Sequence, residues 1–154
     1  MIHESLLVRV NPITSTRHVE MALIRKPEGV YGSYSRFERG EMTLGPTRTP
    51  RPIDTLIFEL VHSLDTGAEV PYQTLDGTSY ELVLRGPTSV EYSFTNPMPP
   101  RNDLIELAAE ITRVEQILRE ETYSPLRRMF HRIIRSLRTT LRSHDASNIA
   151  KKSK

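Results

Sequence analysis

The chain has no cysteine among its 154 residues. This absence excludes disulfide bonds, thiolate metal sites and thiol chemistry, and it agrees with a reducing compartment. The chain also has no apolar run long enough to cross a bilayer. Its first apolar segment is short, is interrupted by Arg9 and follows the acidic Glu4, so it does not resemble a signal peptide. We therefore expect a cytoplasmic protein.

The motifs of the common enzyme classes are missing as well. No nucleophile elbow, phosphate-binding loop or dinucleotide fingerprint occurs, and Asp76-Gly77 lacks the lysine and the helix that follow a phosphate cradle. No two histidines have a metal-binding spacing; they are His3, His18, His62, His131 and His144. Glu120 and Glu121 are neighbours on a predicted helix, so they cannot face one point. We expect a protein that is not an enzyme and has no metal or cofactor.

Charge is present in quantity and is distributed unevenly. Residues 1–112 hold 10 Lys and Arg against 15 Asp and Glu, whereas residues 113–154 hold 11 against 4. The balances of −5 and +7 add to the formal net charge of +2. An acidic body with a basic C-terminal end bears on which partners the protein can bind.

Alternation of apolar and polar residues predicts strands. The clearest pair is a hairpin of residues 80–85 and 90–95, which lies between the turn pairs Asp76-Gly77 and Asn96-Pro97. Residues 17–26 contain good helix formers, but we choose a strand because Pro27-Glu28-Gly29 supplies a hairpin turn after them. The earlier predicted strands are 5–10, 17–26, 30–37 and 41–44.

Helical periodicity appears in three places. Residues 52–65 carry an apolar stripe that begins at Ile53. A second helix is predicted over 103–122 and a third over 125–142, divided at Ser124-Pro125, where serine suits an N-cap and proline suits the first helical position. In the second helix the predicted inner face is Leu104, Leu107, Ala108, Ile111, Val114 (or Glu115) and Leu118.

These elements predict an α+β fold. Strands joined by short turns favour an antiparallel sheet of about five or six strands, with the helices mainly on one face. The expected order is a β-meander, a helix, a β-hairpin and two helices. The length suits one domain over residues 1–142, and the polar end, residues 143–154, is expected to be a disordered basic tail.

Alternation assigns the aromatic residues of the predicted strands to two different faces of the sheet. In residues 30–37 alternation places Tyr31, Ser33, Ser35 and Phe37 on one side, and Tyr34 and Arg36 on the other. The hairpin residues assigned to the core are Tyr80, Leu82, Leu84, Val90, Tyr92 and Phe94. The other face is a candidate protein-binding surface, since Tyr and Arg are common interface anchors. Its candidate residues are Tyr34, Arg36, Glu81, Val83, Arg85 and Glu91.

The arginines of residues 125–142 form a second candidate surface. They could bind an anion such as nucleic acid or an anionic membrane, or they could be a solvated face whose stems cover apolar surface and whose heads pair with the acidic body. We favour the solvated face, because the aromatic residues lie mainly in the strand regions and the apolar stripe suits a core helix. The residues concerned are Arg127, Arg128, Arg132, Arg135, Arg138 and Arg142.

Part of the chain resembles a pattern in small bacterial α+β proteins of the immunity-protein type. The residues that carry the resemblance are Asp76-Gly77-Thr78-Ser79-Tyr80-Glu81-Leu82, a partner strand ending Phe94-Thr95-Asn96-Pro97, and a helix beginning near Leu104. The resemblance covers roughly residues 16–120. It implies a protein that neutralises a toxin by binding it, and it transfers no catalytic residue. The Arg-rich segment from Pro125 onward is an addition to that pattern.

The sequence leads to a protein-binding module, and an immunity protein or inhibitor that neutralises a bacterial toxin is its expected specific form. The alternative is a nucleic-acid-binding protein that uses residues 125–154. An enzyme is third, and a deep pocket with convergent polar groups would support it. A homodimer through the C-terminal helices is a further alternative, and no membrane partner is expected.

Overall fold

The computed structural model describes residues 3–48, 52–69 and 77–152. The chain forms two compact units, Met1–Thr122 and Tyr123–Lys154. The sequence predicted one domain over residues 1–142, whereas the first compact unit ends at Thr122.

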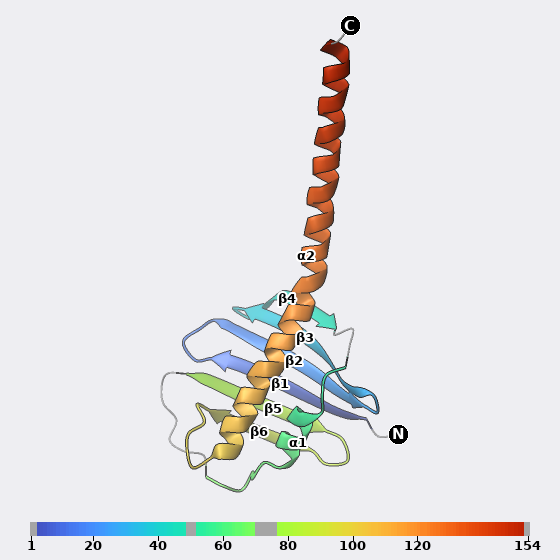
Figure 1. The fold of residues 1–154 in the computed structure, drawn as a ribbon. Coiled ribbons are helices and arrows are strands. Elements are labelled where there is room, and N and C mark those ends of the chain that lie inside the picture. Colours follow the sequence, from blue (N-terminus) through green and yellow to red (C-terminus); the bar gives the residue numbers. More distant parts are fainter. Residues whose placement is uncertain (1–2, 49–51, 70–76, 153–154) are drawn as a thin grey trace. The chain divides into compact units, whose positions relative to one another are not determined.

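The first unit is built on a six-stranded antiparallel sheet in the order β4-β3-β2-β1-β5-β6 (Figure 1). Its strands are β1 (Glu4–Pro12), β2 (Arg17–Lys26), β3 (Gly29–Glu38), β4 (Glu41–Arg48), β5 (Thr78–Arg85) and β6 (Val90–Thr95). The predicted α+β class, the antiparallel sheet and all six strands are confirmed. β4 continues to Arg48, beyond the predicted end at Leu44.

Helices cover one face of this sheet. The helix α1 (Leu56–His62) and the first part of α2 (Asn102–Lys152) lie against it (Figure 1). The pairing register aligns inward side chains into rows, of which one runs through Leu82, Val8, Met21 and Tyr34. From α2 the core receives every residue of the predicted inner face: Leu104, Leu107, Ala108, Ile111, Val114 and Leu118. The inward side of the hairpin is also confirmed, with Leu82, Leu84 and Phe94 buried and Tyr80, Val90 and Tyr92 packed against them.

A glycine lets α2 approach the sheet closely. A Cβ built on Gly32 would lie 2.9 Å from Cδ2 of Leu118, closer than real Cβ contacts allow. The absence of a side chain at Gly32 therefore leaves room for Leu118 of α2 over β3.

The first helix is shorter than predicted. Periodicity indicated a helix over 52–65, but α1 covers only Leu56–His62. Ile53 instead forms a β-bridge with Val30, with N···O distances of 2.8 and 2.9 Å in the two directions. These backbone bonds hold Ile53 in an extended conformation, so the helix begins after it.

The two helices predicted after the hairpin correspond to two parts of α2. The backbone is helical from Asn102 to Lys152, and the boundary between units, after Thr122, falls next to the predicted break at Ser124-Pro125. A proline inside a helix costs about 3 kcal/mol but need not end it. Helix also continues through residues 143–152, which were predicted to be a disordered tail; they contain neither glycine nor proline, so no residue there stops it.

Candidate functional site

The open face of the sheet has an apolar centre. The open face is formed by the outward side chains of β1, β2, β3, β5 and β6, opposite the face that α1 and α2 cover (Figure 1). Leu7 and Ile24 are 39% and 44% exposed there. Leu7 pairs with Val83 on one side and with Ala22 on the other, so these apolar side chains are contiguous across three strands.

Ion pairs border this apolar centre. Arg9 lies between Glu20 and Glu81: its Nε donates to Glu20 Oε1 at 3.0 Å, and one terminal nitrogen donates to Glu81 Oε2 at 3.1 Å. Arg85 pairs with Glu91 on the neighbouring strands of the hairpin. Exposed pairs of this kind contribute little stability. They surround the apolar residues with charged side chains of both signs.

Four of the six predicted protein-binding residues lie on the open face. Glu81, Val83, Arg85 and Glu91 have outward positions in the hairpin. Whether they bind a protein stays a prediction.

The placement of Tyr34 and Arg36 on that face was wrong. Tyr34 is 1% exposed and belongs to the core, and its cross-strand partner is the buried Met21. Arg36 pairs with Val19, which also points toward the helices. Both faces of residues 30–37 carry aromatic and small residues, so alternation alone could not choose between them; the register with β2 decides.

Three apolar members of the open face were missed from the sequence: Leu7, Ala22 and Ile24. A signal was present in β1, where Leu7 interrupts the alternation of the buried residues Leu6, Val8 and Val10. An apolar residue at an outward position of a half-buried strand indicates a surface that can be covered.

A small recess lies where β1, β2, β3 and β5 face α2. Its volume is about 260 Å³, and its polar lining includes Arg17, His18, Arg36, Tyr80 and Glu115. Burial raises the pKa of the Glu115 carboxyl above its ordinary value, although the charges of Arg119 and Arg36 act in the opposite direction.

Burial also raises the pKa of Tyr80, and the charge of Glu115 adds to the effect, whereas a hydrogen bond with Thr112 opposes it. The recess is smaller than ligand pockets usually are, about 300–1,000 Å³. Among the residues that the structure describes, no group of three or more His, Asp or Glu side chains could hold a metal ion. The recess therefore gives no basis for assigning a reaction.

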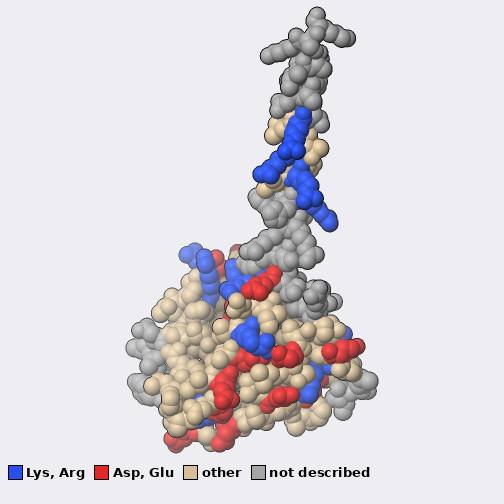
Figure 2. Space-filling view, viewed as in Figure 1, with Lys and Arg blue, Asp and Glu red and all other residues tan. Residues whose placement is uncertain are grey.

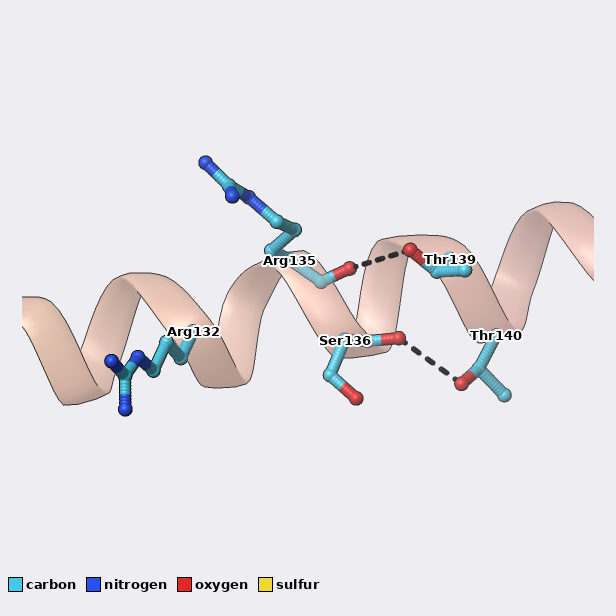
Figure 3. A pocket seen from close by; sticks show the side chains of 5 residues that line it. All are labelled: Arg132, Arg135, Ser136, Thr139 and Thr140. Carbon is cyan, nitrogen blue, oxygen red and sulfur yellow. Dashed lines mark hydrogen bonds between the residues drawn. The ribbon is translucent and has the colours of Figure 1, made fainter.

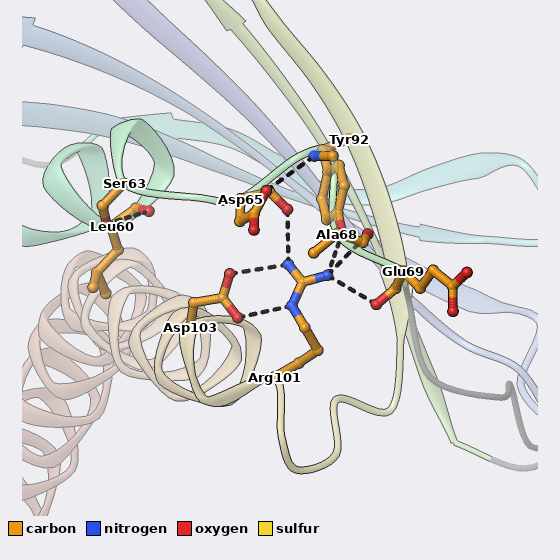
Figure 4. Close-up of polar contacts among 9 residues, drawn as sticks. Leu60, Ser63, Asp65, Ala68, Glu69, Tyr92, Arg101 and Asp103 are labelled. Atoms are coloured by element: carbon orange, nitrogen blue, oxygen red, sulfur yellow. Dashed lines mark hydrogen bonds and ion pairs between the residues drawn. The ribbon is translucent and has the colours of Figure 1, made fainter.

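A buried arginine, Arg101, forms a cluster of hydrogen bonds at the N-terminus of α2 (Figure 4). Arg101 is 7% exposed, and its guanidinium donates to both carboxylate oxygens of Asp103 at 3.0 and 2.9 Å. It also donates to the backbone carbonyls of Asp65, Ala68 and Glu69 at 3.1–3.3 Å. The bonds to Asp103 raise the pKa of Arg101 and lower that of Asp103. Every donor is directed into the protein, so this cluster is structural.

The described arginines of the second unit are exposed on α2. They are Arg132, Arg135, Arg138 and Arg142; the side chains of Arg127 and Arg128 lie outside the description. The side chains of Arg132 and Arg135 extend in different directions, and the depression beside them is an open surface along one helix (Figure 3). In the same stretch Figure 2 shows basic side chains and no acidic ones.

Comparisons with protein-family models, with curated proteins and with solved structures gave no match. The resemblance to bacterial immunity-type proteins therefore stays a prediction. Within the described parts of the chain, no helix combines the length and the apolar character needed to cross a membrane.

Proposed function

We propose that the protein is a cytoplasmic, non-catalytic protein-binding module that contacts its partner through the open face of the sheet. The observation that carries this proposal is the contiguous group Leu7, Ala22, Ile24 and Val83, with ion pairs around it. An antiparallel sheet usually presents polar residues to water on its free face. An apolar centre with a polar rim is instead the arrangement found at protein–protein interfaces.

The charge of the first unit favours a basic partner. Residues 1–122 hold 12 Lys and Arg and 18 Asp and Glu, a formal balance of −6. A partner with a basic surface would be attracted at long range and would then cover the apolar centre. A nuclease toxin with a basic substrate cleft has this chemistry, so we propose an immunity protein or toxin inhibitor as the specific form of the module.

The test uses two isoleucines with the same exposure. Ile24 lies on the open face and Ile13 lies in the turn after β1, and each is 44% exposed. The partner is isolated with the full chain from the native host, purified, and titrated calorimetrically with the wild-type protein, Ile24→Lys and Ile13→Lys. We expect Ile24→Lys to weaken binding at least tenfold, because it places a charge in the apolar centre. Ile13→Lys should bind like the wild type.

Two results would overturn the proposal. One is recovery of the chain from the host only as an isolated monomer. The other is equal binding by the Ile24→Lys and Ile13→Lys proteins, which would place the interface elsewhere. If the partner is a nuclease, the wild-type chain should also inhibit nucleic-acid cleavage and Ile24→Lys should inhibit it less.

A further inference from the structure

The second unit carries an apolar stripe that it cannot cover itself. Met129, Ile133, Leu137 and Leu141 follow one another every four residues on α2 and are 54%, 53%, 60% and 65% exposed. In its described residues this unit consists of one helix, so it contains no second element against which the stripe could pack. Four large apolar side chains in water indicate a surface that something else covers.

Arginines occupy the opposite side of the same helix. At about 100° per residue, the four apolar positions span an arc of roughly 120°. Counted from Met129 in the same way, the four described arginines fall between roughly 180° and 300°. The described part of the helix is therefore sharply divided into an apolar side and a basic side.

We propose that residues 129–142 form an interfacial helix that lies on an anionic lipid bilayer. The apolar stripe would enter the boundary between headgroups and acyl chains, and the long side chains of Arg132 and Arg138, each about 120° from the middle of the stripe, would reach back to lipid phosphates. Guanidinium groups suit this role because they donate in pairs to phosphate oxygens. The stretch is about 21 Å long at 1.5 Å per residue, enough to lie on a bilayer but not to cross one.

An anionic bilayer can contact both the apolar side and the basic side of the helix, whereas a second copy of the chain or a nucleic acid cannot. Residues 123–154 hold nine Lys and Arg and a single acidic residue, Asp145, so a second copy packed on the stripe would bring two strongly basic helices together and supply no counter-charge to the arginines on the opposite side. Nucleic acid would bind the arginines and leave the apolar stripe in water. The sequence led us to expect no membrane partner because the stripe suited a core helix; its exposure removes that reason.

The test is co-sedimentation of the full chain with vesicles. One set contains phosphatidylcholine and phosphatidylglycerol at about three to one, and the other contains phosphatidylcholine alone. We expect binding to the anionic vesicles that weakens as salt is raised, because salt screens the charges. Binding to the neutral vesicles should be at least tenfold weaker.

Matched variants separate the stripe from general hydrophobicity. The double variant Ile133→Gln/Leu137→Gln should lose at least tenfold in affinity for anionic vesicles, and circular dichroism should show that it stays helical. Leu56→Gln, on the exposed side of α1 at 43% exposure, should bind like the wild type. Arg132→Gln/Arg138→Gln should weaken binding to anionic vesicles only.

Three outcomes would overturn the proposal. The first is equal binding to both kinds of vesicle. The second is vesicle binding that Ile133→Gln/Leu137→Gln leaves unchanged. The third is no binding to anionic vesicles. Salt-sensitive binding to a nucleic-acid duplex would then assign the helix to nucleic acid, and a dimer in sedimentation equilibrium that the same double substitution abolishes would assign it to a second copy.

Discussion

Arg101 shows how one side chain can hold distant segments together. Its guanidinium joins the first turn of α2, through Asp103, to the backbone that follows α1, through the carbonyls of Asp65, Ala68 and Glu69. The planar group offers five donors in fixed directions, which a lysine cannot reproduce. The cluster therefore fixes where α2 begins relative to the segment after α1.

Replacing Arg101 with methionine should destabilise the protein by about 3 kcal/mol, because a carboxylate and several carbonyls lose a buried donor. The control is Arg85→Met, which removes an exposed pair with Glu91 and should cost less than about 1 kcal/mol. Urea denaturation at neutral pH measures both. Equal losses in the two variants would contradict a structural role for Arg101.

The same comparison has a definite pH dependence. Hydrogen bonds from Arg101 hold the pKa of Asp103 below its ordinary value. The folded state therefore binds this proton more weakly than the unfolded state, whose aspartate titrates near about 3.9. The stability from the ionised carboxylate is present above that pH and is lost as pH falls through the folded pKa. The difference in unfolding free energy between the wild type and Arg101→Met should accordingly become smaller as the pH is lowered.

The hydrogen-bond cluster of Arg101 could not be predicted from the sequence. The carbonyls that Arg101 binds lie 32 to 36 residues away along the chain, and every residue has a backbone carbonyl, so no residue type marks them. The capping-box spacing of Asp103 and Glu106, by contrast, can be seen in the sequence because that relation is local. Contacts between backbone atoms of distant segments appear only once the chain is folded.

At the scale of elements, the β5–β6 hairpin could be predicted and the orientation of β3 could not. In the hairpin every apolar residue except Val83 falls on one side, so period-two alternation identifies the core face. In β3 both sides carry Tyr, Phe or Ser, and only pairing with β2 places Tyr34 inward. The open face was therefore predicted correctly where the hairpin forms it and incorrectly at Tyr34 and Arg36.

The residues before β5 and after β6 are in close contact, at Gly77 and Asn96. Gly77 has φ +133°, and a Cβ there would lie 1.8 Å from the side-chain amide of Asn96. Asn96 accepts a hydrogen bond from the Thr78 backbone N–H at 3.0 Å and donates its own N–H to the Thr78 carbonyl at 3.2 Å. A side chain at Gly77 would displace the amide that joins the two strand ends.

Gly77→Ala should therefore destabilise the protein more than Gly40→Ala. Gly40 also has a positive φ, +81°, but a Cβ there would meet nothing within 4 Å. Both variants incur the backbone cost of alanine at positive φ, roughly 1–2 kcal/mol, and only Gly77→Ala adds the clash with Asn96. Thermal unfolding followed by circular dichroism compares the two. Equal melting temperatures would show that the Asn96 contact is dispensable.

The whole molecule combines two units of opposite charge. Residues 1–122 have a formal balance of −6 and residues 123–154 a balance of +8, which give the chain its net +2. The hydrophobic core extends in sequence only from Leu6 to Leu118, so all of its members belong to the first unit. The charge asymmetry could be predicted from composition. The end of the compact unit could not, because the same helical periodicity continues past residue 122.

A chain that ends at Thr122 should fold with a cooperative melting transition close to that of the full protein, because it keeps every core residue. A chain that ends at Glu110 is the matched control, since it lacks the buried Ile111, Val114 and Leu118. Each of these contributes roughly 1.5–3 kcal/mol against a total stability of about 5–15 kcal/mol, so this shorter chain should not fold cooperatively. If the chain ending at Thr122 is also unfolded, the first unit depends on residues 123–154 for its stability.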